Sequence, residues 1–159
     1  MRTPIFSLVL SALLVAHATV ADDKASHLAI VVNKNSSLSE IASVDLAKFF
    51  KAEKSKAPDG TKVVIVMQDA GRSEREAALR QIFKMSDGEY NKYFLQATFT
   101  GAVAAAPKAL ANSHSVVKFV SDTPGGLGYV KGDEADESVK VLKIDGKVPG
   151  ETGYPLSLK

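Results

Sequence analysis

Two short apolar runs limit the folds open to this chain more than any other feature of its sequence. Leu28–Val32 and Val63–Val66 are continuous apolar stretches, without the alternation typical of a strand that has one face in water. Such strands are buried on both faces, and the segments that follow them show helical spacing. The predicted order is strand, helix, strand, three helices and two strands. This order predicts an α/β fold in which a mostly parallel sheet has helices on both faces.

The predicted helices are placed by their apolar spacing and by their first residues. Two of them begin at patterns typical of a capping box, Ser73-x-x-Glu76 and Ser86-x-x-Glu89. Residues 102–111 are mostly small, and we expect them to form a loop. The side chains expected in the core are those on the inner helix faces: Leu46, Phe49, Leu79, Ile82, Phe83, Phe94, Phe119 and Val120.

The N-terminus has the pattern of a cleavable secretory signal. Arg2 precedes an apolar run over Ile5–Val15, and small residues follow, with cleavage expected after Ala21 or alternatively after Ala18. The run is too short for a membrane span of about 20 residues. We therefore expect a signal peptide over 1–21 and one domain over 22–159, which is periplasmic or secreted and is not inserted in the membrane after cleavage.

Composition and motifs exclude several classes of function. The chain has no cysteine, and after removal of residues 1–21 its basic and acidic side chains number 19 and 18, because Arg2 is one of the 20 basic residues. This balance gives no argument for binding to nucleic acid. His27 and His114 lie far apart in the sequence and have no ligand spacing, and no catalytic motif occurs. We expect no catalytic residue, no metal and no cofactor.

The loop 68–73, which precedes a predicted helix, is the strongest candidate for a binding site. Free backbone N–H groups at a helix start attract anions, Gly71 allows close approach, and Arg72 and Arg75 add positive charge. The alternative is purely structural: Ser73 caps the helix, Glu76 completes the capping box, and the arginines face water. Both interpretations remain open at the level of the sequence.

The order of several motifs resembles that of the phosphate-binding substrate-binding proteins of ABC transporters, especially of short, single-lobe relatives. The resemblance runs from about Ala29 to Val130. It rests on the segments 31–33, 58–60, 72–76 and 99–101 and, most specifically, on Thr123–Val130, with a weaker echo at 154–156. It implies a type-2 periplasmic-binding-protein-like fold, here in a single lobe. Glu74 departs from the pattern, because the family has a small or hydroxyl residue there.

The resemblance implies phosphate or another oxyanion as ligand and a membrane transporter or sensor as partner. The residues that would hold the anion are Gly71, Arg72, Ser73 and Arg75, joined by Thr100 and Gly101 if these two pack beside the loop. The other hypothesis is an exported protein-interaction module that has kept the fold and lost the ligand. Neither hypothesis requires an enzyme.

Overall fold

The computed structural model describes residues 24–159, so the predicted signal segment lies outside the described residues. A five-stranded sheet has the order β4-β3-β5-β1-β6, and a separate parallel pair joins β2 and β7. The strands are β1 (Leu28–Asn33), β2 (Glu40–Ile41), β3 (Val64–Gln68), β4 (Lys108–Leu110), β5 (Gly126–Lys131), β6 (Val139–Val141) and β7 (Lys143–Ile144). The helices are α2 (Ser43–Phe50), α3 (Ser73–Ala78), the π-helical turn η1 (Leu79–Phe83), α4 (Asp87–Phe99) and α5 (Ser113–Asp122).

The central sheet is mostly parallel, as the sequence predicts. β3 pairs in parallel with both β4 and β5, whereas β1 is antiparallel to β5 and to β6. Four strands therefore run in one direction and β1 runs against them. The two apolar runs do not pair with each other, because β5 from late in the chain lies between them with Ile30 opposite Tyr129.

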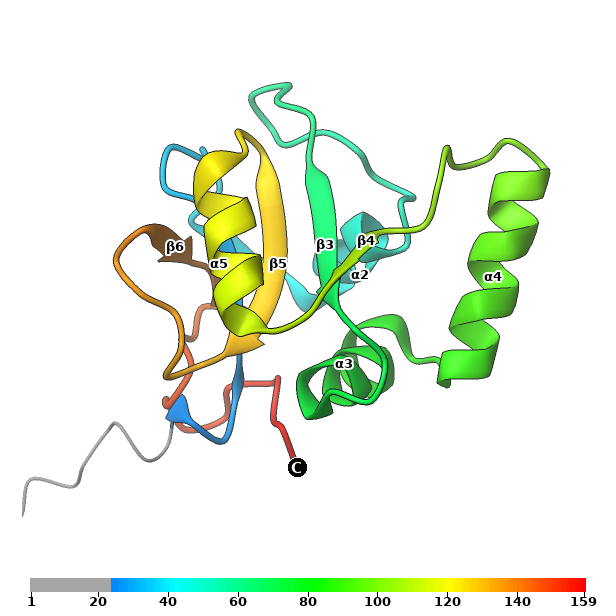
Figure 1. Cartoon of the computed structure of the whole chain (residues 1–159). Helices are drawn as coiled ribbons and strands as arrows, with labels where there is room; N and C mark the ends of the chain where they lie inside the picture. The colour runs from blue at the N-terminus through cyan, green and yellow to red at the C-terminus, as the bar shows by residue number, and fades with distance from the viewer. Residues whose placement is uncertain (1–23) are drawn as a thin grey trace, which may run out of the picture.

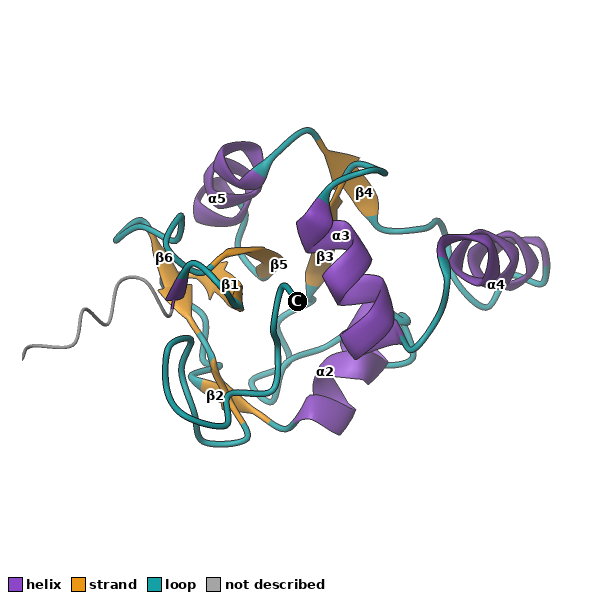
Figure 2. Ribbon diagram, turned by 90° about the horizontal axis from the view of Figure 1, so that it is seen from below, coloured by secondary structure: helices purple, strands orange, loops and turns teal. Residues whose placement is uncertain are grey.

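Helices cover both faces of the sheet, which explains why the strands are apolar throughout. Leu28, Ile30 and Val32 of β1 pack on one face into a core with α2, α3 and η1. Ala29 and Val31 point to the other face and pack against α5. Figures 1 and 2 show the sheet between α5 on one side and α2 with α3 on the other.

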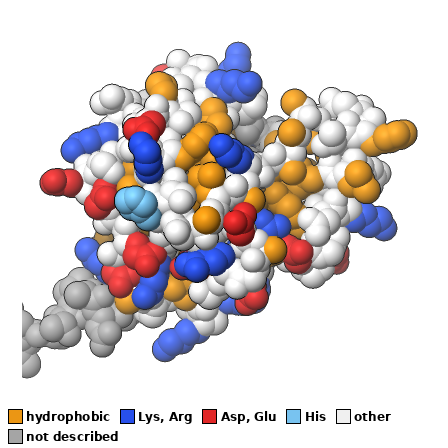
Figure 3. Space-filling view, viewed as in Figure 1, with side chains coloured by type: hydrophobic (Ala, Val, Ile, Leu, Met, Phe, Trp, Pro, Cys, Tyr) orange, Lys and Arg blue, Asp and Glu red, His pale blue; other side chains and the backbone are white. Residues whose placement is uncertain are grey.

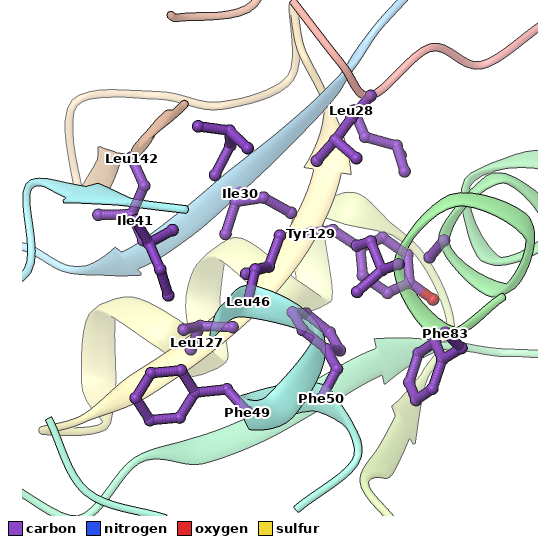
Figure 4. Close-up of a cluster of buried hydrophobic side chains, with 14 of the residues drawn as sticks. Leu28, Ile30, Ile41, Leu46, Phe49, Phe50, Phe83, Leu127, Tyr129 and Leu142 are labelled. Atoms are coloured by element: carbon purple, nitrogen blue, oxygen red, sulfur yellow. The ribbon is translucent and has the colours of Figure 1, made fainter. Parts of the chain in front are cut away.

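On the face of the sheet that packs against α2, α3 and η1, aromatic rings join the helices to the strands. The Phe50 ring lies edge-on to Phe83, with centroids 5.7 Å apart, and 6.0 Å from Tyr129 of β5 (Figure 4). Phe83 also meets Tyr90 edge-on at 5.2 Å, which connects η1 to α4. The predicted core is confirmed with one exception: Phe119 is half-buried, because it lies at the rim of the smaller cluster against α5.

Two glycines determine the backbone of Thr123–Val130, the segment on which the family resemblance most specifically rests. Gly125 has φ +78°, and a Cβ there would lie 2.1 Å from the Lys62 carbonyl oxygen. A Cβ on Gly128 would lie 2.8 Å from a methyl of Val116, so this glycine lets α5 pack directly on the sheet. The segment is therefore a tight passage from helix to strand.

Two local predictions are wrong. The stretch 102–111 contains the short strand β4, whose three residues are too few and too exposed to show a strand pattern. Ser73 does not cap α3, because the N-cap position is Arg72, which makes no side-chain cap bond. The capping box at Ser86 and Glu89 is confirmed. Within residues 24–159, no helix combines the length and hydropathy that crossing a membrane requires.

Candidate functional site

The carboxyl ends of the three parallel strands meet at one edge of the sheet, the lower edge in Figure 1. Gln68 at the end of β3 pairs with Leu110 at the end of β4, and β5 ends beside them at Lys131. Loops from this edge lead to α3, to α5 and to β6. In open α/β sheets, ligands bind outside the carboxyl ends of the strands.

A pocket of about 500 Å³ opens at this edge, between the first turn of α5, the loop before α3 and the loop after β5. Its volume is within the range of small-molecule sites. The lining residues are Arg72, Asn112, Ser113, His114, Val117, Glu134 and Asp136. All but one are polar, so the pocket suits a polar solute.

Arg72 supplies a guanidinium that the rest of the described chain does not engage by hydrogen bonding. Its side chain is 43% exposed, and its nearest carboxylate, that of Glu74, is 3.7 Å away. Its Nε is buried and has no hydrogen-bond partner among residues 24–159. Gly71, with φ +83°, turns the chain into this position. Arg72 could turn toward a ligand without breaking an internal hydrogen bond, although its ion pair with Glu74 would then be shared or lengthened.

Ser113, which the sequence analysis missed, is the most buried polar group that lines the pocket. It is 3% exposed and follows Asn112, the N-cap of α5, whose side chain accepts a bond from the Ser115 N–H. The Ser113 Oγ accepts bonds from Gln68 Nε2 at 3.2 Å and from the Lys131 N–H at 3.4 Å. Its own proton has no acceptor in this arrangement among the described residues, and Gln68 Oε1, on the amide that contacts Ser113, is likewise a buried acceptor without a partner.

Two carboxylates from the loop after β5, Glu134 and Asp136, also line the pocket. The Glu134 side chain is exposed and makes no hydrogen bond or ion pair within the described part of the chain. Asp136 accepts a hydrogen bond from the Ser138 N–H at 2.8 Å. Hydrogen bonds from the Ser138 side chain and backbone, and the charge of His114, hold the pKa of Asp136 below its usual value. The lining therefore combines hydrogen-bond donors, at Arg72 and the first turn of α5, with two carboxylates from the loop after β5.

Ser73 and Glu74 turn toward each other at the start of α3. The Ser73 Oγ donates to Glu74 Oε2 at 3.2 Å, and the Glu74 side chain is 5% exposed. The buried carboxylate of Glu74 therefore occupies a donor that the sequence assigned to an anion. The Ser73 hydroxyl lies beside the pocket-lining Arg72 without being part of the lining.

Arg75 is a structural residue rather than a free cation. Its side chain is 9% exposed, its Nε and one terminal nitrogen donate to Asp87 Oδ1 at 3.2 and 2.9 Å, and the other terminal nitrogen donates to the Gln68 carbonyl at 3.2 Å. The guanidinium also lies 4.9 Å from the Tyr90 ring centroid. All three of its nitrogens are engaged within the described chain, which favours a structural role over the predicted contact with a ligand.

Thr100 and Gly101 do not join the loop at Gly71 and Arg72. They follow the last residue of α4, whereas Asp87, the first residue of this helix, is the one that holds Arg75. A helix of 13 residues is about 20 Å long, so they lie far from Arg75. The Thr100 hydroxyl donates to the carbonyls of Gln96 and Ala97 within its own helix. Within residues 24–159, no group of three or more metal-ligating side chains is present.

Comparisons with solved structures give the fold. A protein from Clostridium perfringens, assigned as a phosphate ABC transporter substrate-binding protein and solved with bound phosphate, aligns with TM-score 0.62 and 16% identity, over 80% of this chain and 49% of its own. An ABC-type phosphate transport receptor from Vibrio cholerae aligns with TM-score 0.62 and 15% identity, over 78% and 48%. PstS from Borrelia burgdorferi aligns with TM-score 0.62 and 15% identity, over 82% and 54%.

The chain shares the fold of phosphate-binding proteins of ABC transporters. The predicted fold class, a single-lobe form of the periplasmic-binding-protein-like fold, is thereby confirmed. The chain spans about half the length of these neighbours. No protein-family model and no curated protein matches it.

Proposed function

We propose that the protein is an exported solute-binding module and not an enzyme. It holds a small solute through an anionic, oxygen-bearing group between Arg72 and Ser113. One observation carries this proposal. Arg72, whose guanidinium makes no hydrogen bond, and Ser113, whose buried hydroxyl accepts two hydrogen bonds and donates none within the described residues, line the same pocket at the carboxyl edge of the sheet. The likeness to phosphate-binding proteins supports phosphate as the first oxyanion to test and a membrane transporter or sensor as partner.

Several donors converge on the proposed oxyanion position. Arg72 donates with charge, and such bonds are roughly twice as strong as neutral ones. The first turn of α5 adds backbone N–H groups and the positive end of its dipole. The pocket is open on one side, so the bound group stays partly hydrated and screened. We expect a dissociation constant on the order of millimolar, which is about 4 kcal/mol.

The test is calorimetric titration of the exported, processed protein with phosphate and with sulfate. Arg72→Ala and Ser113→Ala should each weaken binding at least about tenfold, which is about 1.4 kcal/mol. Glu74→Thr removes the competing carboxylate and should strengthen binding. Arg80→Ala is the matched control, because Arg80 lies in η1 outside this pocket. If phosphate, sulfate and a carboxylate-bearing solute such as L-alanine all fail to bind to every variant, even well above millimolar concentration, the proposal is refuted. N-terminal sequencing of the same material tests cleavage after Ala21, and recovery of intact Met1 would contradict export by a cleaved signal.

A second candidate function is protein interaction, and the far side of the molecule favours it. Leu95 and Phe99 on α4 are 74% and 90% exposed. Figure 3 shows hydrophobic side chains gathered over α4 and the region beside it, whereas charges of both signs alternate over the rest of that face. An apolar groove of about 560 Å³ lies nearby, between Phe50 and the segment 102–108. This function becomes the better one if the titrations show no solute.

A further inference from the structure

The structure points to a zwitterion, such as a free α-amino acid, as the solute that fits this pocket. This inference rests on the proposed function, because it assumes that an oxyanion group binds between Arg72 and Ser113. It adds that a cationic group of the same solute binds to Glu134, with Asp136 beside it. The carboxylate of the solute would accept hydrogen bonds from Arg72 and Ser113, and its ammonium group would donate to Glu134 and Asp136.

The charges around the pocket oppose a simple anion. Arg72 is the only side chain with a permanent positive charge among the described lining residues, and it already faces the buried carboxylate of Glu74. Glu134 and Asp136 line the same pocket and repel any ligand of net negative charge. A phosphate dianion would have to overcome this repulsion, whereas a zwitterion brings no net charge and satisfies both the donors and the carboxylates.

The hydrogen-bond donors Arg72 and Ser113 argue against a simple cation as the ligand. The unused proton of Ser113 and the guanidinium of Arg72 both require an acceptor, and an ammonium group has none. A cation alone would leave the Ser113 hydroxyl without an acceptor, and an unsatisfied buried donor is unfavourable. The solute must therefore carry an acceptor as well as a donor.

A sugar would also offer acceptors and donors, but the lining suits it less. Val117 is the one apolar side chain of the described lining and the His114 imidazole is its one ring, so a sugar ring would find little apolar surface to pack on. The donors and the acceptors of the lining both include charged groups, and charged partners make the stronger hydrogen bonds. These features favour a small ligand with a charge at each end.

Glu134 is the residue that most directly tests the inference. Its carboxylate has no partner in the described part of the chain, so its replacement disturbs no internal contact. Asp136, in contrast, receives the Ser138 N–H and helps to shape its own loop. Glu137 is an exposed acid in the same loop that does not line the pocket, and Glu137→Gln is therefore a matched control.

The experiment compares the binding of L-alanine with that of two analogues, propionate and ethylamine, each of which lacks one of its charged groups. Binding is measured by NMR titration of the exported protein. Propionate lacks the ammonium group of alanine and ethylamine lacks the carboxylate; phosphate and glycerol are added as further ligands. We expect L-alanine to bind at least about tenfold more tightly than propionate and ethylamine. Glu134→Gln should bring alanine down to the affinity of propionate without weakening propionate, and Glu137→Gln should change neither.

The outcomes separate the inference from the function on which it rests. If propionate or phosphate binds as tightly as alanine, with dependence on Arg72 and Ser113, the solute is a simple anion and the inference is wrong while the proposed function stands. Tighter binding of glycerol than of alanine, or no effect of Glu134→Gln on alanine, also overturns the inference. If none of the ligands binds, the proposed function fails as well.

Discussion

Replacing Arg75 by alanine should cost much more stability than the same replacement of Arg72, three residues earlier. Arg75 is buried against Asp87, the Gln68 carbonyl and the Tyr90 ring. The Arg72 side chain is 43% exposed, makes no hydrogen bond within residues 24–159 and has one ion pair, with Glu74 at 3.7 Å. The two substitutions remove the same side chain from the same segment, so they isolate the effect of the contacts.

The expected magnitude follows from the contacts that Arg75 loses. Its bonds to Asp87 involve a carboxylate whose side chain is 51% exposed, so we take the lower end of the range for charged hydrogen bonds, about 1.5 kcal/mol. The unpaired Gln68 carbonyl adds about 1 kcal/mol, and the contact with the Tyr90 ring adds about 0.5–1 kcal/mol. We expect Arg75→Ala to lower the free energy of unfolding by about 3 kcal/mol, and Arg72→Ala to lower it by about 1 kcal/mol at most, because it loses only a half-exposed ion pair with Glu74.

Urea unfolding followed by circular dichroism measures both free energies of unfolding. The slope of the transition should stay unchanged, because neither substitution alters the surface exposed on unfolding to a large extent. Equal stability of Arg75→Ala and the unmodified protein would show that the buried guanidinium contributes nothing. A loss for Arg72→Ala as large as that for Arg75→Ala would show that Arg72 is also structural, and it would remove the basis for the proposed site.

Three further predictions concern the core and its titration. Phe83→Ala should cost about 3–5 kcal/mol, because the ring is fully buried among aromatic neighbours; a loss below 1 kcal/mol in urea unfolding would contradict this packing. Gly128→Ala should cost about 1–3 kcal/mol, because its Cβ would lie 2.8 Å from a methyl of Val116, while Gly88→Ala, which meets nothing within 4 Å, should cost nothing; equal effects would refute the close approach. Burial raises the pKa of Tyr90 from 10.0 to about 12, so the unfolded chain ionises first and stability should fall as pH rises from 10 toward 12; an unchanged urea midpoint over this interval would contradict the burial of the phenol.

The sequence predicts the elements of the fold better than their order in the sheet. Leu28–Val32 is apolar because helices cover both faces of its strand; Val63 and Val66 are buried in the same way, whereas Val64 and Ile65 are half-buried, and both apolar patterns are local. The insertion of β5 between β1 and β3 depends on contacts such as Ile30 with Tyr129, which are 99 positions apart, and no periodicity reports them. β4 was missed because its neighbours in the sheet, and not its own three residues, determine that it is a strand.

The candidate site was predicted only in part, for a related reason. Arg72, which the sequence assigned to the site, lines the pocket, because it precedes a helix that follows a strand, and this arrangement is visible in the sequence. Arg75 looked equivalent, because the partner that buries it, Asp87, begins a different helix 12 residues later. Ser113 was missed because the strand before it was missed. The pattern of Asn112 at the N-cap, with Ser115 three residues on, was the available signal for a helix start at that point.

The central claim is that a solute carrying an anionic oxygen-bearing group binds at the carboxyl edge of the sheet. The most direct measurement is the map of backbone amide shifts of the ¹⁵N-labelled protein during titration with propionate, compared with Ser113→Ala. The account predicts saturable shifts at 71–73 and 112–115, with α4 unaffected, and their loss in Ser113→Ala. Shifts confined to α4 and the segment 102–108, or shifts at the edge that Ser113→Ala leaves unchanged, would contradict it.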